Sequence, residues 1–189
     1  DCVGFDPVSS DPRVLAGFQK RFPHFPAVDR QRLLDDPSIE FVVVSAKPSD
    51  RAALSIAAMR RGKDVMSDKP GVTTAEQLAE IERTVAETGR VWAVAFSERF
   101  VKKSARKAWE LARDGAIGHV VQTIGIGPHR LNRVLRPSWF FDKPAYGGIV
   151  VDIGCHQIDQ FIAFAGTEDI QIVSSSVGCF GTEPAGFED

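Results

Sequence analysis

A regular alternation of short apolar runs and amphipathic stretches constrains the fold of the first half of this chain. Apolar runs at Ile39–Ser45, Asp64–Met66 and Val91–Phe96 are typical of strands, and the stretches between them carry apolar residues at helical spacing. The run at Ile39–Ser45 is continuous, which favours a parallel strand buried on both faces. With Cys2–Asp6 as an earlier strand, this order predicts an α/β fold with a doubly wound parallel sheet.

The pattern changes after the last of these strands. Two amphipathic helices are predicted at Ser104–Arg113 and Gly148–Phe164, and two further strands at Val120–Gly127 and Ile170–Phe180. The stretch Arg130–Tyr146 carries aromatic residues and prolines without periodicity, so we expect a loop there. The second half therefore has a different architecture from the first.

Composition and charge exclude several classes of function. The 189 residues are 43% hydrophobic and 25% charged, which suits two small domains, placed at 1–98 and 99–189. A net charge of -2 gives no electrostatic basis for binding nucleic acid or a membrane, and no apolar run approaches the ~18 residues of a membrane span. The three cysteines, Cys2, Cys155 and Cys179, form no Cys-x-x-Cys pair, so neither disulfides nor a metal site are predicted. We expect a cytoplasmic protein, although a chain that begins with Asp says little about a signal peptide.

Lys69 is the strongest candidate for a reactive group in the first half. It follows the apolar strand at Asp64–Met66 within the sequence Val-Met-Ser-Asp-Lys-Pro-Gly. Ligands of open α/β sheets bind at the carboxyl edge of the strands, where a lysine can reach both a cofactor and a substrate hydroxyl. The alternative is a solvated loop lysine. The same tripeptide recurs at Asp142-Lys143-Pro144, but only the first copy follows an apolar strand.

Asp152 and His156 are the candidates in the second half. They are four residues apart, so a helix places them on one face, one turn from each other. A carboxylate there can orient an imidazole that acts as a general base toward a hydroxyl proton. Gly147 and Gly148 precede them and allow close approach of a ligand or another backbone. The alternative is a capping aspartate and a core histidine.

Asp6 ends the first predicted strand, where an acid commonly binds the adenosine ribose of NAD. The alternative is an ordinary turn residue, because Pro7 follows it. No Gly-x-Gly-x-x-Gly precedes it in this sequence. The pair Gly125 and Gly127 lies inside a predicted strand, and the segment 181–186 lacks the Lys-Ser/Thr of a phosphate loop.

Together these stretches resemble the glucose-fructose oxidoreductase, inositol dehydrogenase and MocA (Gfo/Idh/MocA) family. Asp68-Lys69-Pro70 is similar to the family's Glu-Lys-Pro, and the segment 147–156 is similar to its Gly-Gly-x-x-x-Asp-x-Gly-x-His. Ala46-Lys47-Pro48 stands where the family has a Thr-Pro loop, and 97–100 where it has a polar residue, Arg and an aromatic. The resemblance runs from about Val3 to Phe187.

The resemblance implies a Rossmann-like domain, followed by an α+β domain with an open, mainly antiparallel sheet that is often used for oligomerisation. It implies hydride transfer with NAD, or alternatively NADP, at a secondary alcohol of a sugar, polyol or related compound. It also implies a homo-oligomer, a dimer or tetramer, in the full-length form. The candidate site residues are catalytic Lys69, Asp152 and His156; cofactor-binding Asp6, Ser45, Lys47, Pro48, Asp68, Lys69 and Arg99; and substrate-binding His129 and Trp139.

Some residues depart from the family pattern. Asp68 replaces the family's Glu, and Arg51 stands where a histidine is common. The first strand and the glycine loop are missing, and one predicted strand follows the catalytic helix where several are expected. We therefore expect these 189 residues to be part of a longer oxidoreductase. The alternatives are a non-catalytic fragment or family member, a structural interaction module, and a different enzyme on a doubly wound fold, such as a nucleotide-sugar transferase.

Overall fold

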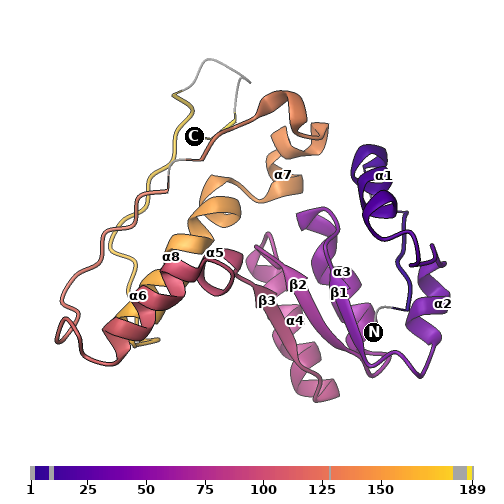
Figure 1. The fold of residues 1–189 in the computed structure, drawn as a ribbon, viewed down its shortest axis with the longest axis horizontal. Coiled ribbons are helices and arrows are strands. Elements are labelled where there is room, and N and C mark those ends of the chain that lie inside the picture. Colours follow the sequence, from indigo (N-terminus) through magenta and orange to yellow (C-terminus); the bar gives the residue numbers. More distant parts are fainter. Residues whose placement is uncertain (1–2, 9–10, 128, 181–186, 189) are drawn as a thin grey trace. The chain divides into compact units, whose positions relative to one another are not determined.

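The computed structural model describes residues 3–8, 11–127, 129–180 and 187–188. The chain divides into two compact units between residues 94 and 95, close to the predicted boundary after residue 98 (Figure 1).

The first unit is built around a three-stranded sheet with strand order β1-β2-β3. β1 and β2 are parallel, with Val44 opposite Ser67, and the predicted alternation of strands and helices is confirmed. Its elements are α1 (Pro12–Arg21), α2 (Arg30–Asp35), β1 (Phe41–Val44), α3 (Pro48–Met59), β2 (Asp64–Asp68), α4 (Ala75–Thr88) and β3 (Trp92–Ala95).

Local sequence signals set the ends of these helices. Asp11 caps α1 by accepting a hydrogen bond from the Arg13 amide, and a proline occupies the first turn. Thr74 caps α4 by accepting a bond from the Gln77 amide. Gly89 ends α4 with a φ of 65°, a left-handed conformation that favours glycine.

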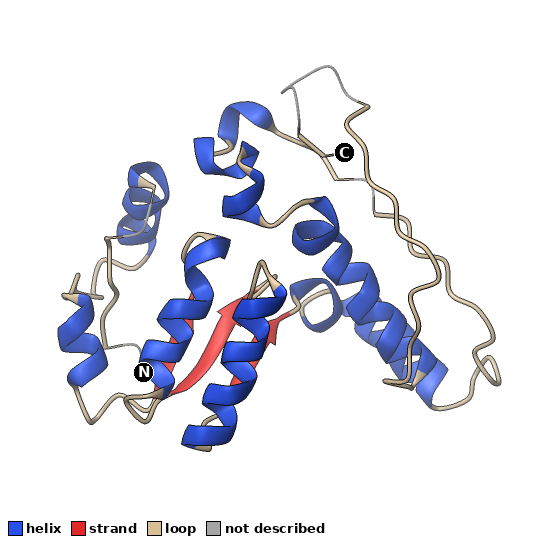
Figure 2. Ribbon diagram, turned by 180° about the vertical axis from the view of Figure 1, so that it is seen from behind, coloured by secondary structure: helices blue, strands red, loops and turns tan. Residues whose placement is uncertain are grey.

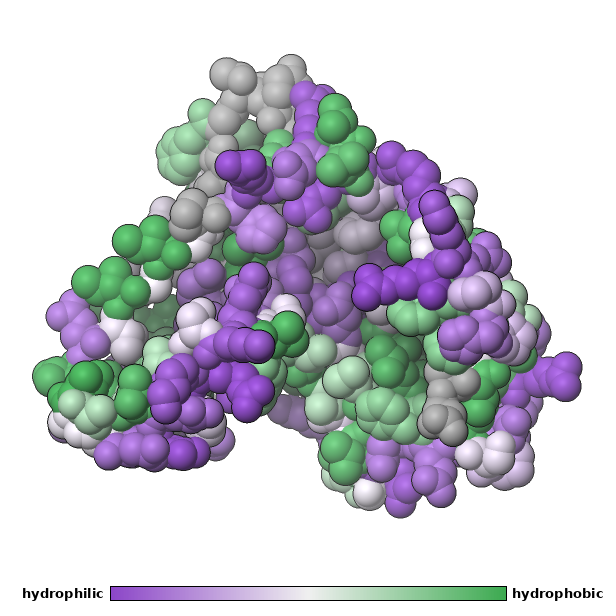
Figure 3. Space-filling view, in the orientation of Figure 1, coloured by the Kyte–Doolittle hydropathy of each residue, from purple (hydrophilic) through white to green (hydrophobic). Residues whose placement is uncertain are grey.

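Helices α3 and α4 pack against each other and cover one face of the sheet (Figure 2). The core between them and the sheet consists of Leu34, Val44, Ala52, Ile56, Ala58, Met59, Val65 and Ile81. On β1, Phe41 is 54% exposed and Val43 56% exposed, and Figure 3 shows apolar side chains gathered over the sheet. The prediction that this strand is buried on both faces is therefore wrong for the described residues. Within the described residues, α3 and α4 lie on the same face of the sheet, because both crossovers return on that side.

The predicted strand at Cys2–Asp6 is reduced to one parallel bridge between Phe5 and Ala27. Its two backbone hydrogen bonds run from the Phe5 amide to Pro26 and from the Val28 amide to Phe5. Cys2 lies outside the described residues. The prediction of a strand here is wrong for the described part, since a single bridge is too short to form a ladder.

The second unit is mainly helical. Its elements are α5 (Ser97–Phe100), α6 (Lys103–Arg113), the 3₁₀ turns η1 (Arg133–Leu135) and η2 (Ser138–Phe141), α7 (Lys143–Tyr146), a π-helical turn η3 (Val150–Gly154) and α8 (Cys155–Ala165). Trp109 on α6 donates its indole N–H to the Ala163 carbonyl on α8 at 3.2 Å. A separate aromatic cluster is made of Phe140, Tyr146 and Phe187 with the half-buried Trp139 and Phe141.

The predicted strands at Val120–Gly127 and Ile170–Phe180 form no sheet ladder in the described part of this unit; both are loops (Figure 2). Their apolar side chains lie in water, with Val121 90% and Val173 90% exposed. The expected antiparallel sheet is therefore not seen. Extended segments become stable strands when several pair and bury a common face, and the described residues of this unit supply no such face.

Candidate functional site

The carboxyl ends of β1 and β2 lie together at one edge of the first unit's sheet, because the two strands are parallel and in register. Five predicted cofactor residues lie at these ends: Ser45, Lys47 and Pro48 come after β1, Asp68 is the last residue of β2, and Lys69 follows it. Such an edge is where open α/β sheets bind their ligands. The structure thus brings these five residues together, while their roles stay predictions.

The main chain of Lys69 is held on both sides. Asp68 accepts a hydrogen bond from the Lys69 amide at 2.9 Å through Oδ1. The Arg51 guanidinium donates to the carbonyl oxygens of Lys69 and, at 3.2 Å, of Asp68. Lys69 itself is half-buried at the turn that follows β2.

Gly71 fixes the path of the chain beyond this lysine. The Lys69–Pro70 peptide bond is cis, and Gly71 follows with a φ of 85°. A Cβ at Gly71 would lie 2.8 Å from Val94 and 3.0 Å from Trp92 on β3. Glycine is therefore required here for both conformation and space.

Asp6 lies just after the isolated bridge and is 18% exposed. Its carboxylate accepts a hydrogen bond from Arg30 Nε at 2.6 Å and another from the Val8 amide at 2.9 Å. The structure thus adds an arginine beside Asp6, and the ribose contact stays a prediction.

Asp152 and His156 lie on one continuous helical segment in the second unit. Both are buried, at 6% and 8% exposed. The predicted helix from Gly148 to Phe164 contains the π-helical turn Val150–Gly154, so Asp152 lies on the π turn and His156 on α8. π-Helical turns are rare overall, and those that occur are often at functional sites. The ring of Phe96 packs edge-on against the His156 ring, with 6.2 Å between centroids.

Glu188 holds the start of this helical segment. Its carboxylate accepts a hydrogen bond from the Ile149 amide at 3.0 Å. It also forms an ion pair with the Lys143 ammonium group, which donates a hydrogen bond to it. Gly148 has a φ of 93°, and a Cβ there would lie 2.6 Å from Glu188 Oε2. The bond from Lys143 and the Ile149 amide lower the pKa of Glu188 below its ordinary value.

The Glu188 contact makes stability depend on pH. A carboxylate with a lowered folded-state pKa stabilises the fold above its ordinary pKa of 4.5, and this contribution is lost as pH falls through the folded-state pKa. We expect Glu188→Gln to lower the free energy of unfolding at pH 7 and to have a smaller effect at pH 3. Urea denaturation at the two pH values measures this difference. An equal loss at both would contradict the assignment.

Arg99, a predicted cofactor residue, is engaged within the second unit. It donates two hydrogen bonds to Asp159, both at 2.7 Å, and this pairing raises the pKa of the Arg99 guanidinium. The guanidinium also lies over the Phe100 ring at 4.1 Å. The pair joins α5 to α8, and contact of Arg99 with a cofactor stays a prediction.

The two predicted substrate residues have different surroundings. His129 is exposed, whereas Trp139 is half-buried in the aromatic cluster, 6.1 Å from the Phe140 ring. In the same cluster burial raises the pKa of the Tyr146 hydroxyl, and the charge of Glu188 adds to the effect. Substrate contact by His129 or Trp139 stays a prediction.

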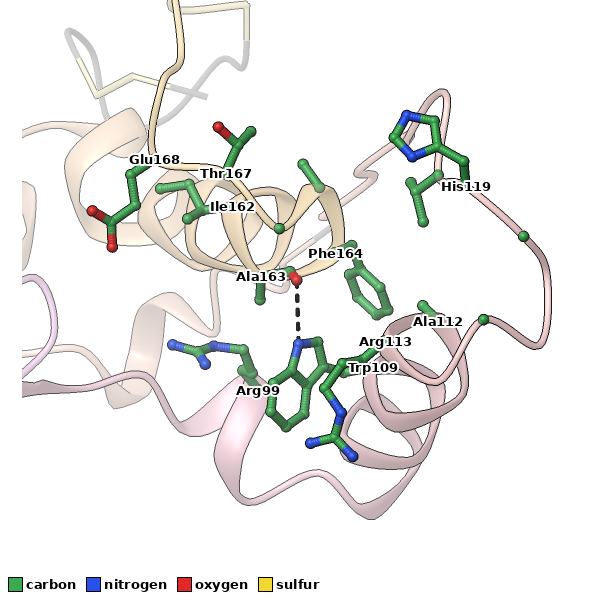
Figure 4. Close-up of a pocket in the computed structure, with 15 residues that line it drawn as sticks. Arg99, Trp109, Ala112, Arg113, His119, Ile162, Ala163, Phe164, Thr167 and Glu168 are labelled. Carbon is green, nitrogen blue, oxygen red and sulfur yellow. Dashed lines mark hydrogen bonds between the residues drawn. The ribbon is translucent and has the colours of Figure 1, made fainter.

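A hollow of about 750 Å³ lies at the ends of α6 and α8 (Figure 4). Trp109 forms part of its wall, and of the predicted site residues described by the structure Arg99 alone lines it. In Figure 4 the side chains of Arg99 and Glu168 end at the left of the view and that of Arg113 ends at the bottom.

Three residues support these positions although no such role was predicted for them: Arg51, Asp159 and Glu188. Arg51 carried a usable signal, because it lies in the first turn of α3, where a cation opposes the helix dipole. An arginine placed there requires acceptors of its own. Asp159 and Glu188 carried no such signal, since their partners are 60 and 39 residues away.

Within the described ranges, the chain has neither a cluster of metal ligands nor a membrane-spanning helix. In those residues, no group of three or more His, Cys, Asp or Glu side chains could hold a metal ion. In the same part of the chain, no helix combines the length and apolar character needed to cross a membrane.

Known families match two stretches that together span most of the chain. Residues 8–96 match the oxidoreductase family with an NAD-binding Rossmann fold, and residues 105–189 match the GFO/IDH/MocA C-terminal domain. The gap between the two matches falls near the division between the two units.

Individual proteins show the same likeness. An oxidoreductase from Erwinia carotovora atroseptica, whose assignment is itself provisional, has a crystal structure with a TM-score of 0.90 and 44% identity, covering 95% of this chain and 54% of that one. The structure of levoglucosan dehydrogenase in complex with NADH and levoglucosan has a TM-score of 0.64 and 26% identity. The match covers 82% of this chain and 43% of that one. D-xylose dehydrogenase of Paenarthrobacter nicotinovorans is 26% identical over 135 residues, which are 69% of this chain and 34% of the relative. An uncharacterized oxidoreductase of Schizosaccharomyces pombe is 33% identical over 137 residues, 71% of this chain and 36% of the relative. The chain thus spans about a third of the length of these two curated relatives.

Proposed function

This chain belongs to the Gfo/Idh/MocA family of oxidoreductases, and we propose that the protein transfers a hydride between a nicotinamide cofactor and a secondary alcohol of a sugar or polyol. The matched relatives include dehydrogenases of xylose and levoglucosan, which supports this substrate class. The proposal applies to the whole protein, of which these residues form at least a part.

One observation carries the proposal. Lys69 lies at the carboxyl edge of the parallel sheet, and hydrogen bonds hold both its amide and its carbonyl. A fixed main chain limits where the ammonium group can reach, which is what the orientation of a substrate hydroxyl requires.

The chemistry assigns a role to each catalytic candidate. Oxidation of an alcohol removes a proton from the hydroxyl oxygen and a hydride from the carbon that bears it, and NAD, when bound, would supply the hydride acceptor. Lys69 donates a hydrogen bond to the substrate oxygen and stabilises its developing negative charge. His156 takes the hydroxyl proton as general base, and Asp152 orients the imidazole or the substrate. In the reverse direction His156 returns the proton.

In this proposal the residues of the first unit bind part of a nicotinamide dinucleotide. Asp6 would accept the adenosine ribose hydroxyls, and Ser45, Lys47 and Pro48 would lie toward the nicotinamide end. Arg30, bonded to Asp6 at 2.6 Å, is a cation that could serve the extra phosphate of NADP, so NAD is the primary proposal and NADP the alternative.

The remaining features of the proposal concern the second unit. His129 and Trp139 would contact the substrate, and Arg99 would contact the cofactor. We also propose that the exposed apolar segments at 120–127 and 170–180 join an open antiparallel sheet in a homo-oligomer, a dimer or tetramer. Burial of side chains such as Val121 and Val173 would supply the driving force.

Titration of the protein with NADH, followed by nicotinamide fluorescence, tests the proposed function. We expect saturable binding that Asp6→Ala weakens and that Asp11→Ala, a matched change at an acid that caps α1, leaves unchanged. A parallel titration with NADPH decides between the two cofactors, and a panel of polyols with NAD follows. A folded protein that binds neither cofactor would favour the non-catalytic alternative.

A further inference from the structure

We propose that Arg51 is a positioning residue for Lys69, and that this arginine and Asp68 together act as a clamp on the lysine's main chain. The inference rests on the proposed function for its catalytic consequence, but the clamp itself is a property of the first unit. We call these two residues the Arg51–Asp68 clamp.

The clamp joins three segments at the carboxyl edge of the sheet. Arg51 Nε donates to the Ala46 carbonyl at 2.7 Å, in the loop that follows β1. Its Nη1 donates to the carbonyls of Asp68 and Lys69, and its Nη2 lies 3.3 Å from Asp68 Oδ2. A single guanidinium on α3 therefore ties the end of β2 to the loop after β1.

The second half of the clamp is the Asp68 carboxylate. One of its oxygens receives Arg51, and the other accepts the Lys69 amide at 2.9 Å. The two peptide groups that flank the Lys69 Cα are thus both fixed by hydrogen bonds. Rotation of this backbone would break at least one charge-assisted bond, and such bonds are about twice as strong as neutral ones.

Burial explains why the arginine cannot be replaced by another cation. The Arg51 side chain is 6% exposed and lies in the first turn of α3, where the helix dipole disfavours a positive charge. Its position is therefore maintained by the carbonyl and carboxylate oxygens around it. Lysine keeps the charge but lacks the planar fork that reaches several acceptors at once.

The test replaces Arg51 with lysine and measures hydrogen exchange of the Lys69 amide together with steady-state kinetics. We expect faster exchange at Lys69 and a fall in kcat of about 10²-fold, the cost of misplacing a reacting group by about 1 Å. The fall in kcat should exceed any change in KM or in NADH affinity, because a displaced Lys69 stabilises the developing charge on the substrate oxygen less well. A fall in kcat that is larger than the change in KM distinguishes a positioning role from a general loss of structure.

Lys63→Met is the matched control. Lys63 is 2% exposed and donates to the carbonyls of Asp36 and Ile39 at 2.6 and 2.8 Å, just before β2 begins. It is thus a buried cation of the same unit that also binds backbone oxygens, at the opposite end of the strand. We expect this variant to lose stability while the Lys69 amide exchange and the kcat of the folded protein stay unchanged.

Each result is decisive. Unchanged exchange at Lys69 in Arg51→Lys would overturn the clamp, and faster exchange with unchanged kcat would overturn its positioning role. The same loss of kcat in Lys63→Met would assign the effect to stability and also overturn the proposal. If the unmodified protein oxidises no polyol, the proposed function fails, and faster exchange would still confirm the clamp on its own.

Discussion

Replacement of His156 with glutamine lowers turnover by about 10²–10⁴-fold, the usual contribution of a general acid or base, while binding of the nicotinamide cofactor is retained. Glutamine keeps a polar side chain of similar reach but cannot take up a proton at neutral pH. His156 is 8% exposed and packs against the Phe96 ring, so its imidazole is held in place rather than free to swing in solvent. Steady-state kinetics with a polyol substrate and NADH titration measure the two effects.

His119→Gln provides the control for this experiment. His119 is exposed in the same unit and belongs to none of the proposed catalytic positions. We expect this variant to retain full turnover. If His156→Gln also retained full turnover, His156 would have no part in the mechanism, and the Asp152–His156 pair would be the capping aspartate and core histidine of the alternative interpretation.

Replacement of Lys69 with methionine has an effect of the same order, a fall in kcat of about 10²–10⁴-fold. Methionine keeps most of the side chain's length and apolar surface but removes the charge that would stabilise the substrate oxygen. Because the main chain of Lys69 is fixed by its amide and carbonyl, the fold should tolerate this change. Circular dichroism and thermal unfolding check that it does, and kinetics measure the loss.

The chain carries its own control for the lysine. Lys143 stands in an identical Asp-Lys-Pro tripeptide, but it begins α7 and pairs with Glu188 instead of following a strand. We expect Lys143→Met to keep its turnover and to lose stability. A similar fall in kcat in both variants would show that Lys69 has no special role, and neither variant losing activity would remove it from the mechanism.

The first unit shows how far local sequence patterns reach. The three strands and the helices between them could be predicted because each depends on its own run of residues. Which faces of the sheet the helices cover could not be predicted, because this depends on the side of the sheet on which each crossover helix packs. An apolar run such as Phe41–Val44 has the same composition whether one face or both are covered.

The site shows the same division. The spacing of Asp152 and His156 placed them correctly on one helical segment, but hydrophobic periodicity does not reveal the π turn at Val150–Gly154. The reach of Arg51 to Asp68 spans 17 residues and depends on tertiary packing. The Gly147-Gly148 pair predicted that another group lies close to the backbone here. In the structure this group is the Glu188 carboxylate, which lies beside Gly148.

In the part of the chain that the structure describes, no helix covers the second face of the β1–β2–β3 sheet, and this has a thermodynamic consequence. The heat capacity change of unfolding follows the apolar surface that becomes hydrated, and side chains such as Phe41 and Val43 are already largely hydrated in the folded state. They contribute little to that change or to the denaturant m-value. The curve of stability against temperature is therefore flatter than that of a protein of equal length whose sheet is covered on both faces.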